Sequence, residues 1–258
     1  MSTWQVLGVG IIGGLALVGT GVPSVSGHSN AATSDSDEIA FASRRDGNWE
    51  IYVMDAAGQN QRRLTRRDAE DRFPLWSHDR RHIAFASMVG TSWELWVMDA
   101  DGTHQRRLTS GIAVKSTRGW SSDDRRIVYA AGPRNNTAIY VVTVSTGEVT
   151  RLTMPPGVQS DPCWSPDGAL VAFSSTRDGT SHIYVTNADG RGARQVTTGA
   201  GSDASPQWSP DARLIAFVSE REHVRDVYAT GVDGGRPQRL TNGLARHGTH
   251  RSGRRMDR

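Results

Sequence analysis

Short apolar runs recur along this chain at a fixed interval. Each unit holds a run such as IAF, then a run such as EIYVM, and then the triplet RLT or a close variant. Runs of this length predict β-strands rather than helices, because they are rich in β-branched and aromatic residues and are separated by Gly, Asp and Pro. The first run of each unit starts 44 residues after the previous one, at Ile39, Ile83, Ile127, Val171 and Ile215.

A fourth strand-like segment ends in the pair Trp-Ser in the second to fifth units, and the first unit has Ala32-Thr33 at this place. The turn after it is clearest at Ser165-Pro166-Asp167-Gly168, where Pro and Gly stand at the positions that a type I β-turn prefers. A period of 40–50 residues with four strands per unit indicates a β-propeller with one unit per blade. We therefore predict an all-β chain of five four-stranded repeats of 44 residues, at approximately 27–70, 71–114, 115–158, 159–202 and 203–246.

The residues that recur once per unit have structural roles in this interpretation. We expect Trp76, Trp120, Trp164 and Trp208 to pack between blades, the alternative being ligand-stacking platforms. The aspartate that follows each Trp-Ser pair is expected to hydrogen-bond within its turn, the alternative being a metal ligand. The single cysteine, Cys163, lies beside Trp164 and is predicted to be a buried structural thiol.

The combined motif WSPDG–IAF–RDG–IYVMD–ADG–RRLT resembles the repeat of the TolB-like, WD-like β-propeller family. The resemblance covers roughly residues 37–241. It implies a propeller that acts as an interaction module. Members such as bacterial TolB carry six blades behind a small N-terminal α/β domain, whereas this chain shows five repeats preceded by a short linker.

The two ends of the chain differ from the repeats. Residues 6–22 are apolar and uncharged and precede a stretch rich in Pro, Ser, Gly, Asn and Ala. We predict that residues 1–27 are a signal peptide or an N-terminal membrane anchor, which makes the protein periplasmic, secreted, or anchored facing outside the cytoplasm. A mis-assigned start codon followed by disordered sequence is the third interpretation. The propeller would then occupy residues 28–246, with a basic tail at 247–258.

The tail bears on both charge and closure of the propeller. Five arginines and one aspartate lie between residues 244 and 258, so the formal net charge of +3 belongs to this end of the chain. We expect a solubilising terminus and no nucleic-acid partner, because the aromatic residues that bind single strands are missing. The tail lies where a sixth inner strand would begin, so it would supply the inner strand of the first blade and close a five-bladed ring. Alternatively, the first unit uses its own degenerate strand. The remaining alternatives are an oligomeric ring and an incomplete six-bladed ring.

Motifs for catalysis and cofactor binding do not occur in the chain. The eight histidines form no ligand-spaced pair on a predicted helix, and there is neither a G-x-S-x-G motif nor a glycine-rich phosphate loop. We predict no catalytic residue, no metal and no cofactor.

The beginning of each inner strand supplies the candidate binding residues. Five residues before each Trp-Ser pair the sequence places charged or polar side chains of both signs, which would surround the mouth of the central funnel. Such a mouth suits a peptide or a small polar ligand, and the alternative is an ordinary hydrated channel. The predicted site residues are Asp71, Arg72, Lys115, Arg118, Gln159, Asp161 and Asp203.

These features favour a non-catalytic, monomeric, extracytoplasmic propeller that binds a protein or peptide partner of the cell envelope at its funnel face. Association with a membrane through the N-terminal apolar run belongs to the same interpretation. The alternatives are a propeller enzyme, such as a polysaccharide lyase or hydrolase, and a module that binds a small ligand or glycan in the funnel.

Overall fold

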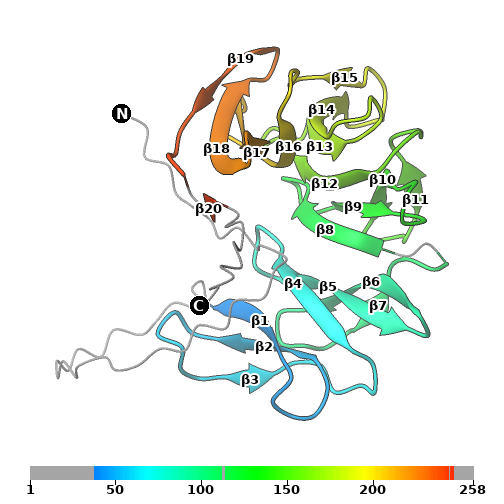
Figure 1. Cartoon of the computed structure of the whole chain (residues 1–258). Helices are drawn as coiled ribbons and strands as arrows, with labels where there is room; N and C mark the ends of the chain where they lie inside the picture. Colours follow the sequence, from blue (N-terminus) through cyan, green and yellow to red (C-terminus); the bar gives the residue numbers. More distant parts are fainter. Residues whose placement is uncertain (1–37, 112–113, 244, 247–258) are drawn as a thin grey trace, which may run out of the picture. The chain divides into compact units, whose positions relative to one another are not determined.

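The regular elements of the structure are β-strands. The structure is a computed structural model that describes residues 38–246 except 112–113 and 244, with the side chains of 115–118 and 245–246 also outside the described part. Within this range the strands form five antiparallel sheets in chain order (Figure 1). No helix in the described range is long and apolar enough to cross a membrane. The predicted N-terminal signal or anchor and the tail from residue 247 lie outside the described residues.

The first three sheets consist of eleven strands. The first sheet has β1 (Ile39–Ser43), β2 (Glu50–Met54) and β3 (Arg62–Arg63). The second has β4 (Asp71–Trp76), β5 (His82–Val89), β6 (Ser92–Asp99) and β7 (Arg106–Arg107). The third has β8 (Val114–Trp120), β9 (Arg126–Ala131), β10 (Ala138–Thr143) and β11 (Val149–Arg151).

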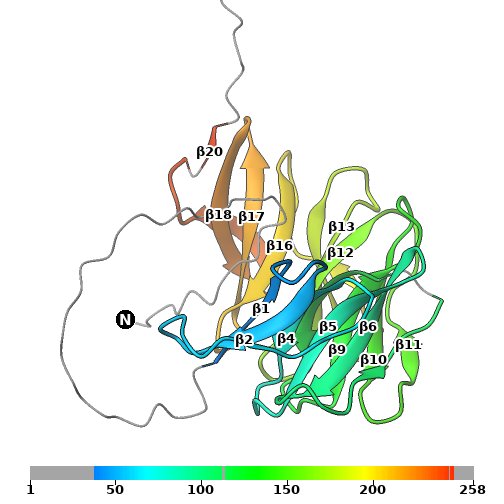
Figure 2. The same cartoon turned by 90° about the horizontal axis from the view of Figure 1, so that it is seen from below.

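The last two sheets complete the repeat. The fourth has β12 (Gln159–Trp164), β13 (Leu170–Ser175), β14 (His182–Asn187) and β15 (Arg194–Gln195). The fifth has β16 (Ser202–Trp208), β17 (Leu214–Arg221), β18 (Val224–Gly231) and β19 (Gly234–Arg239), and the short β20 (Ala245–Arg246) pairs with β18. Figure 2 shows β16, β17 and β18 side by side.

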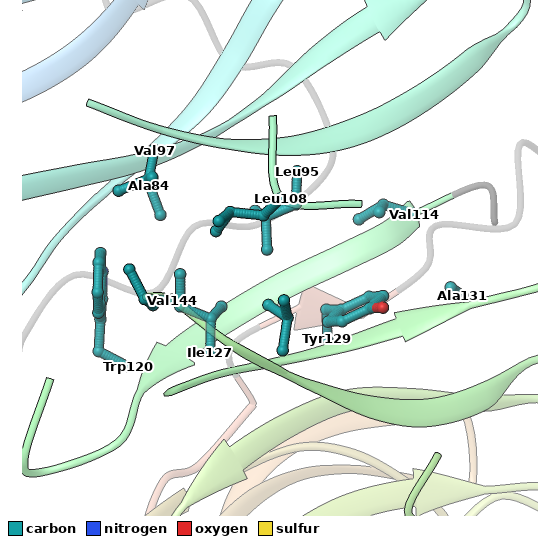
Figure 3. Packing of buried hydrophobic residues seen from close by; sticks show 11 residues of the cluster. Ala84, Leu95, Val97, Leu108, Val114, Trp120, Ile127, Tyr129, Ala131 and Val144 are labelled. Carbon is teal, nitrogen blue, oxygen red and sulfur yellow. The ribbon is translucent and has the colours of Figure 1, made fainter. Parts of the chain in front are cut away.

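This arrangement confirms the predicted β-propeller fold. The second strands β5, β9, β13 and β17 begin 44 residues apart, as the apolar pattern predicted. The central apolar residues of β5, β9 and β13 are buried on both faces because each of these sheets packs against its neighbours in chain order. Figure 3 shows one such interface, in which Ala84, Leu95, Val97 and Leu108 of the second sheet meet residues of the third, among them Val114, Trp120, Ile127 and Tyr129.

The repeated tryptophans pack between sheets, as predicted. Trp120 is 3% exposed and its Nε1 donates to the Leu75 carbonyl oxygen of the preceding sheet at 3.1 Å. Trp208 makes the equivalent bond to the Cys163 carbonyl at 3.3 Å. Cys163 itself is buried, as predicted.

The predicted turn role of the repeated aspartates is also confirmed. The Ser165 hydroxyl donates to Asp167 at 2.5 Å and accepts the Leu170 backbone N–H at 2.9 Å. This bond holds the pKa of Asp167 below its usual value. Ser-Asp pairs at the same register make the same bond, with the same effect on the pKa, at Asp79, Asp123 and Asp211.

Arginines of the fourth strands make hydrogen bonds between sheets, a role that the sequence did not predict. Arg62, Arg106 and Arg194 donate to backbone carbonyls of the following sheet, at Ala100, Val144 and Val232. These bonds join neighbouring sheets.

The outward faces of the first and last sheets are less covered than the faces between them. Ile39 is 44% exposed, whereas the equivalent Ile83 is fully buried. Leu240 of the fifth sheet is 47% exposed, whereas Leu64, its equivalent, is 5% exposed. In the described residues the first sheet has no inner strand. The segments proposed to supply one, the degenerate first strand and the tail, lie outside the described residues.

Candidate functional site

The inner strands share an irregularity near their beginning. Their pairing with the second strands is interrupted by β-bulges in β4, β8, β12 and β16. Phe73, Asp161 and Ser205, which are equivalent in the repeat, have φ angles of 56°, 52° and 55°. Bulges redirect the side chains of a strand and are over-represented next to functional sites. The bulges of β4, β12 and β16 lie just after Asp71, Gln159 and Asp203, which are three of the predicted site residues.

Asp71 is buried in a small polar cluster within its own sheet. Its side chain has no exposed surface, and Arg67 Nη2 lies 2.9 Å from Oδ1 and 3.1 Å from the Ser87 hydroxyl. Burial raises the pKa of Asp71, and hydrogen bonds from Ser87 together with the charge of Arg67 oppose that rise. The Asp71 backbone N–H also donates to the Trp49 carbonyl of the preceding sheet at 2.8 Å. Oδ1 and the backbone N–H of Asp71 therefore serve the fold.

Asp203 has an equivalent environment in the fifth sheet. Its Oδ1 accepts a hydrogen bond from Ser219 at 2.6 Å and lies 3.8 Å from Arg221 Nη2. Its Oδ2 lies 3.4 Å from His182 Nδ1, a partner from the fourth sheet. Asp203 is fully buried, so the structure places both acids away from solvent, each beside an arginine and a serine.

Gln159 is the neutral counterpart of these acids. Its Oε1 accepts from Thr153 and its Nε2 donates to the Met154 carbonyl at 2.9 Å. Its backbone N–H and carbonyl bond to the Thr137 hydroxyl, at 2.8 and 2.6 Å. A cavity of about 490 Å³ opens beside it and is lined by Arg134, Asn135, Thr137, Val158, Gln159 and Ser160.

Of the remaining predicted residues, Asp161 is placed less deeply. Asp161 is half-buried at the bulge of β12, where Ser160 lies within 3.4 Å of its carboxylate. Lys115 and Arg118 lie in β8, with side chains outside the described part. Asp71, Gln159 and Asp203 thus occupy equivalent positions in three sheets, and each bonds to its own surroundings. Their role as ligand contacts stays a prediction.

Sequence analysis missed an aromatic cluster around Arg72. The Arg72 guanidinium carbon lies 4.5 Å from the Trp49 ring centroid and 5.6 Å from that of Trp93. The Phe73 ring meets Trp93 edge-on at 6.0 Å and is 52% exposed. Trp49 and Trp93 are 44 residues apart, which is the one signal in the sequence that pointed to this cluster.

A second cavity lies between the first two sheets. It has a volume of about 570 Å³ and mixes cationic with acidic side chains. Its lining includes Glu38, Arg62, Trp76, Arg80, Arg81, His82 and Asp99. Arg62 is ion-paired with Glu38 at 2.9 Å, and Asp99 lies 2.7 Å from His104 Nδ1. Among the side chains that the structure describes, no group of three His, Cys, Asp or Glu is placed to hold a metal ion.

The five repeated sheets, which pack on one another in chain order, define a β-propeller. A family model described as the TolB beta propeller domain matches residues 86–252, which is more than half of the chain. The chain belongs to this family.

Solved structures show the same fold at low sequence identity. A putative TolB from Agrobacterium tumefaciens is 24% identical with a TM-score of 0.64, over 74% of this chain and 73% of that one. TolB from Acinetobacter baumannii is 22% identical with a TM-score of 0.64, over 80% of this chain and 53% of that one. An oligogalacturonate lyase in complex with manganese is 21% identical with a TM-score of 0.66, over 80% and 62%. A comparison with curated proteins found no match.

Proposed function

We propose that this protein is a non-catalytic, TolB-like propeller that acts outside the cytoplasm and binds a protein or peptide partner. The partner would bind at the face where the inner strands begin. The observation that carries the proposal is the burial of the acidic residues at this face: Asp71 and Asp203 are buried beside Arg67 and Arg221. A general acid or base must reach its substrate, and these carboxylates are engaged within the fold.

The exposed groups of this face are of the kind that binds proteins. Phe73 is exposed beside Arg72 and Trp93, and Met154 is 68% exposed next to Gln159. Aromatic residues, Met and Arg are enriched in protein interfaces. The putative TolB from A. tumefaciens has the same fold, which supports the choice of a TolB-like role.

Capture of a partner tests this proposal. The full chain would be used as bait in envelope extract beside the variants Lys115→Ala and Arg134→Ala on the candidate face. Arg191→Ala is the matched control, because Arg191 is highly exposed in the turn between β14 and β15. We expect one partner that is retained by the control and weakened by a variant of the face.

A parallel assay addresses the enzyme alternative, since one similar structure is named as a lyase. The same protein would be incubated with oligogalacturonate, with and without manganese, and β-elimination followed by the ultraviolet absorbance of the unsaturated product. Turnover would overturn the non-catalytic proposal.

A further inference from the structure

Phe73 combines two unfavourable features that stability alone does not explain. Its ring is 52% exposed, and its φ of 56° lies in the left-handed region, which is costly for a bulky side chain. The equivalent residues of the fourth and fifth sheets, Asp161 and Ser205, are polar and half-buried, and they have the same positive φ at the bulge. Strained residues of this kind cluster at ligand-binding sites.

The two tryptophans beside it are also unusual for their position in the repeat. In the third and fourth sheets this position is held by Thr137 and Ser181, whose hydroxyls donate to backbone carbonyls of the next inner strand at 2.6 and 2.8 Å. Small hydroxyl residues therefore fulfil the structural role. Trp49 and Trp93 supply large rings in the first two sheets only, so that the aromatic surface is confined to one part of the face.

Arg72 holds the cluster together. Its guanidinium lies over both indole rings, and Glu70 Oε2 balances its charge at 3.0 Å. Arginine stacked on aromatic rings loses little conformational freedom when it binds a partner, and Trp, Tyr and Arg dominate the hot spots of protein interfaces. Phe73 thus projects from a rigid base.

Basic loops lie next to this cluster. Asn48 donates from its side-chain amide to the carbonyls of Arg67 and Ala69, so that the loop before β2 and the loop before β4 are joined. Arg44, Arg45 and Arg66 are exposed on these loops. Among the described residues, Arg66 has no ion-pair partner. The exposed carboxylates of these loops form ion pairs with arginines, except that of Asp68.

We infer that Trp49, Arg72, Phe73 and Trp93 form the anchor point for a peptide segment of a partner protein, one that places an apolar side chain on Phe73 and adjacent carboxylates toward the basic loops. This inference rests on the proposed function and adds to it the chemistry of the partner. Apolar contact with Phe73 provides affinity, and the arginines select acidic neighbours through electrostatic complementarity.

Two measurements on the full chain test the inference. The first is the thermal unfolding of Phe73→Ser, the residue found at position 205. If Phe73 serves binding, the midpoint stays equal to that of the parent or rises, because the substitution removes an exposed ring from a left-handed position. A lower midpoint would show that Phe73 stabilises the fold, and would overturn the inference.

The second measurement selects binding peptides from a phage-displayed library of random twelve-residue sequences. We expect the selected sequences to carry an aromatic or leucine residue beside aspartates or glutamates. Phe73→Ser and Arg72→Gln should each weaken the binding of the corresponding synthetic peptide at least tenfold. Leu214→Ser is the control, because Leu214 is an apolar residue, 38% exposed, at the start of β17. This variant should leave binding unchanged.

The outcomes separate this inference from the proposed function. Peptides that bind the parent, Phe73→Ser and Arg72→Gln equally would overturn the anchor point and leave a peptide-binding propeller in place. Selected peptides without acidic residues would overturn the partner chemistry. Failure to select any peptide would count against the proposed function, and the anchor would be overturned with it.

Discussion

Among the described glycines, Gly190 is the one where an added Cβ would come closest to another atom. It lies in the turn between β14 and β15 with a φ of 83°, and a Cβ added there would lie 2.5 Å from the carbonyl oxygen of Leu152 in the preceding sheet. Gly58 has the same place in the first sheet and a similar φ of 76°, but no atom lies within 4 Å of its added Cβ. The pair Gly190→Ala and Gly58→Ala therefore separates backbone strain from sheet packing.

The expected losses follow from these two effects. Placing alanine in the left-handed region costs about 1–2 kcal/mol, and this cost applies to both variants. Forcing an extra methyl into a packed contact costs a further ~1–3 kcal/mol, and this cost applies only to Gly190→Ala. We expect the free energy of unfolding to fall by about 1–2 kcal/mol for Gly58→Ala and by about 2–5 kcal/mol for Gly190→Ala.

Urea unfolding followed by tryptophan fluorescence measures this difference. With a dependence of about 3 kcal/mol per molar urea, the packing cost lowers the midpoint of Gly190→Ala by up to about 1 M relative to Gly58→Ala. Equal losses for the two variants would refute the reasoning, because they would show that the turn of the fourth sheet does not press on Leu152.

Two further predictions concern the turns after the inner strands. The hydrogen bond from Ser165 keeps the pKa of Asp167 in the folded chain below its unfolded value of about 3.9. The stability that this bond contributes is therefore fully present above the unfolded pKa and is lost as the pH falls through the folded pKa. Ser165→Ala should therefore flatten the decline in stability on acidification, measured by urea unfolding between about pH 2 and 6, and an unchanged decline would contradict this assignment. Ala212 has a φ of 58° where the fourth sheet has Gly168, so Ala212→Gly should raise the free energy of unfolding by about 1 kcal/mol. A loss of stability would show that its conformation is not strained.

The fold could be predicted from the sequence because its determinants repeat. The second to fifth blades reuse a similar apolar triplet, the tryptophan and the Ser-x-Asp turn, so that a single unit such as Trp164 to Asp167 describes four blades. The partners of Arg62, Arg106 and Arg194 could not be predicted, because they are backbone carbonyls of the next sheet, which no residue type reveals.

The candidate site could be predicted only as a set of positions. Asp71 and Asp203 are equivalent in the repeat, yet the arginines beside them come from different places in their units. Arg67 lies before the inner strand, and Arg221 is the last residue of the second strand. Their burial could therefore not be inferred from the period. The exposure of Phe73 depends on a bulge and a positive φ, and neither has a signature in a phenylalanine.

The repeated contact between neighbouring sheets also determines how this protein would respond to mechanical force. The second, third and fourth sheets each pack against two neighbours, whereas the first and fifth have outward faces on which Ile39 and Leu240 are exposed. Stability in such an array is a sum of unit and neighbour contributions, so a chain pulled from its two ends would release its blades from the ends inward. One unit of 44 residues, fully extended, adds about 150 Å of length. The chain would thus lengthen in steps of equal extension, and the blade that unfolds at the lowest force would unfold first.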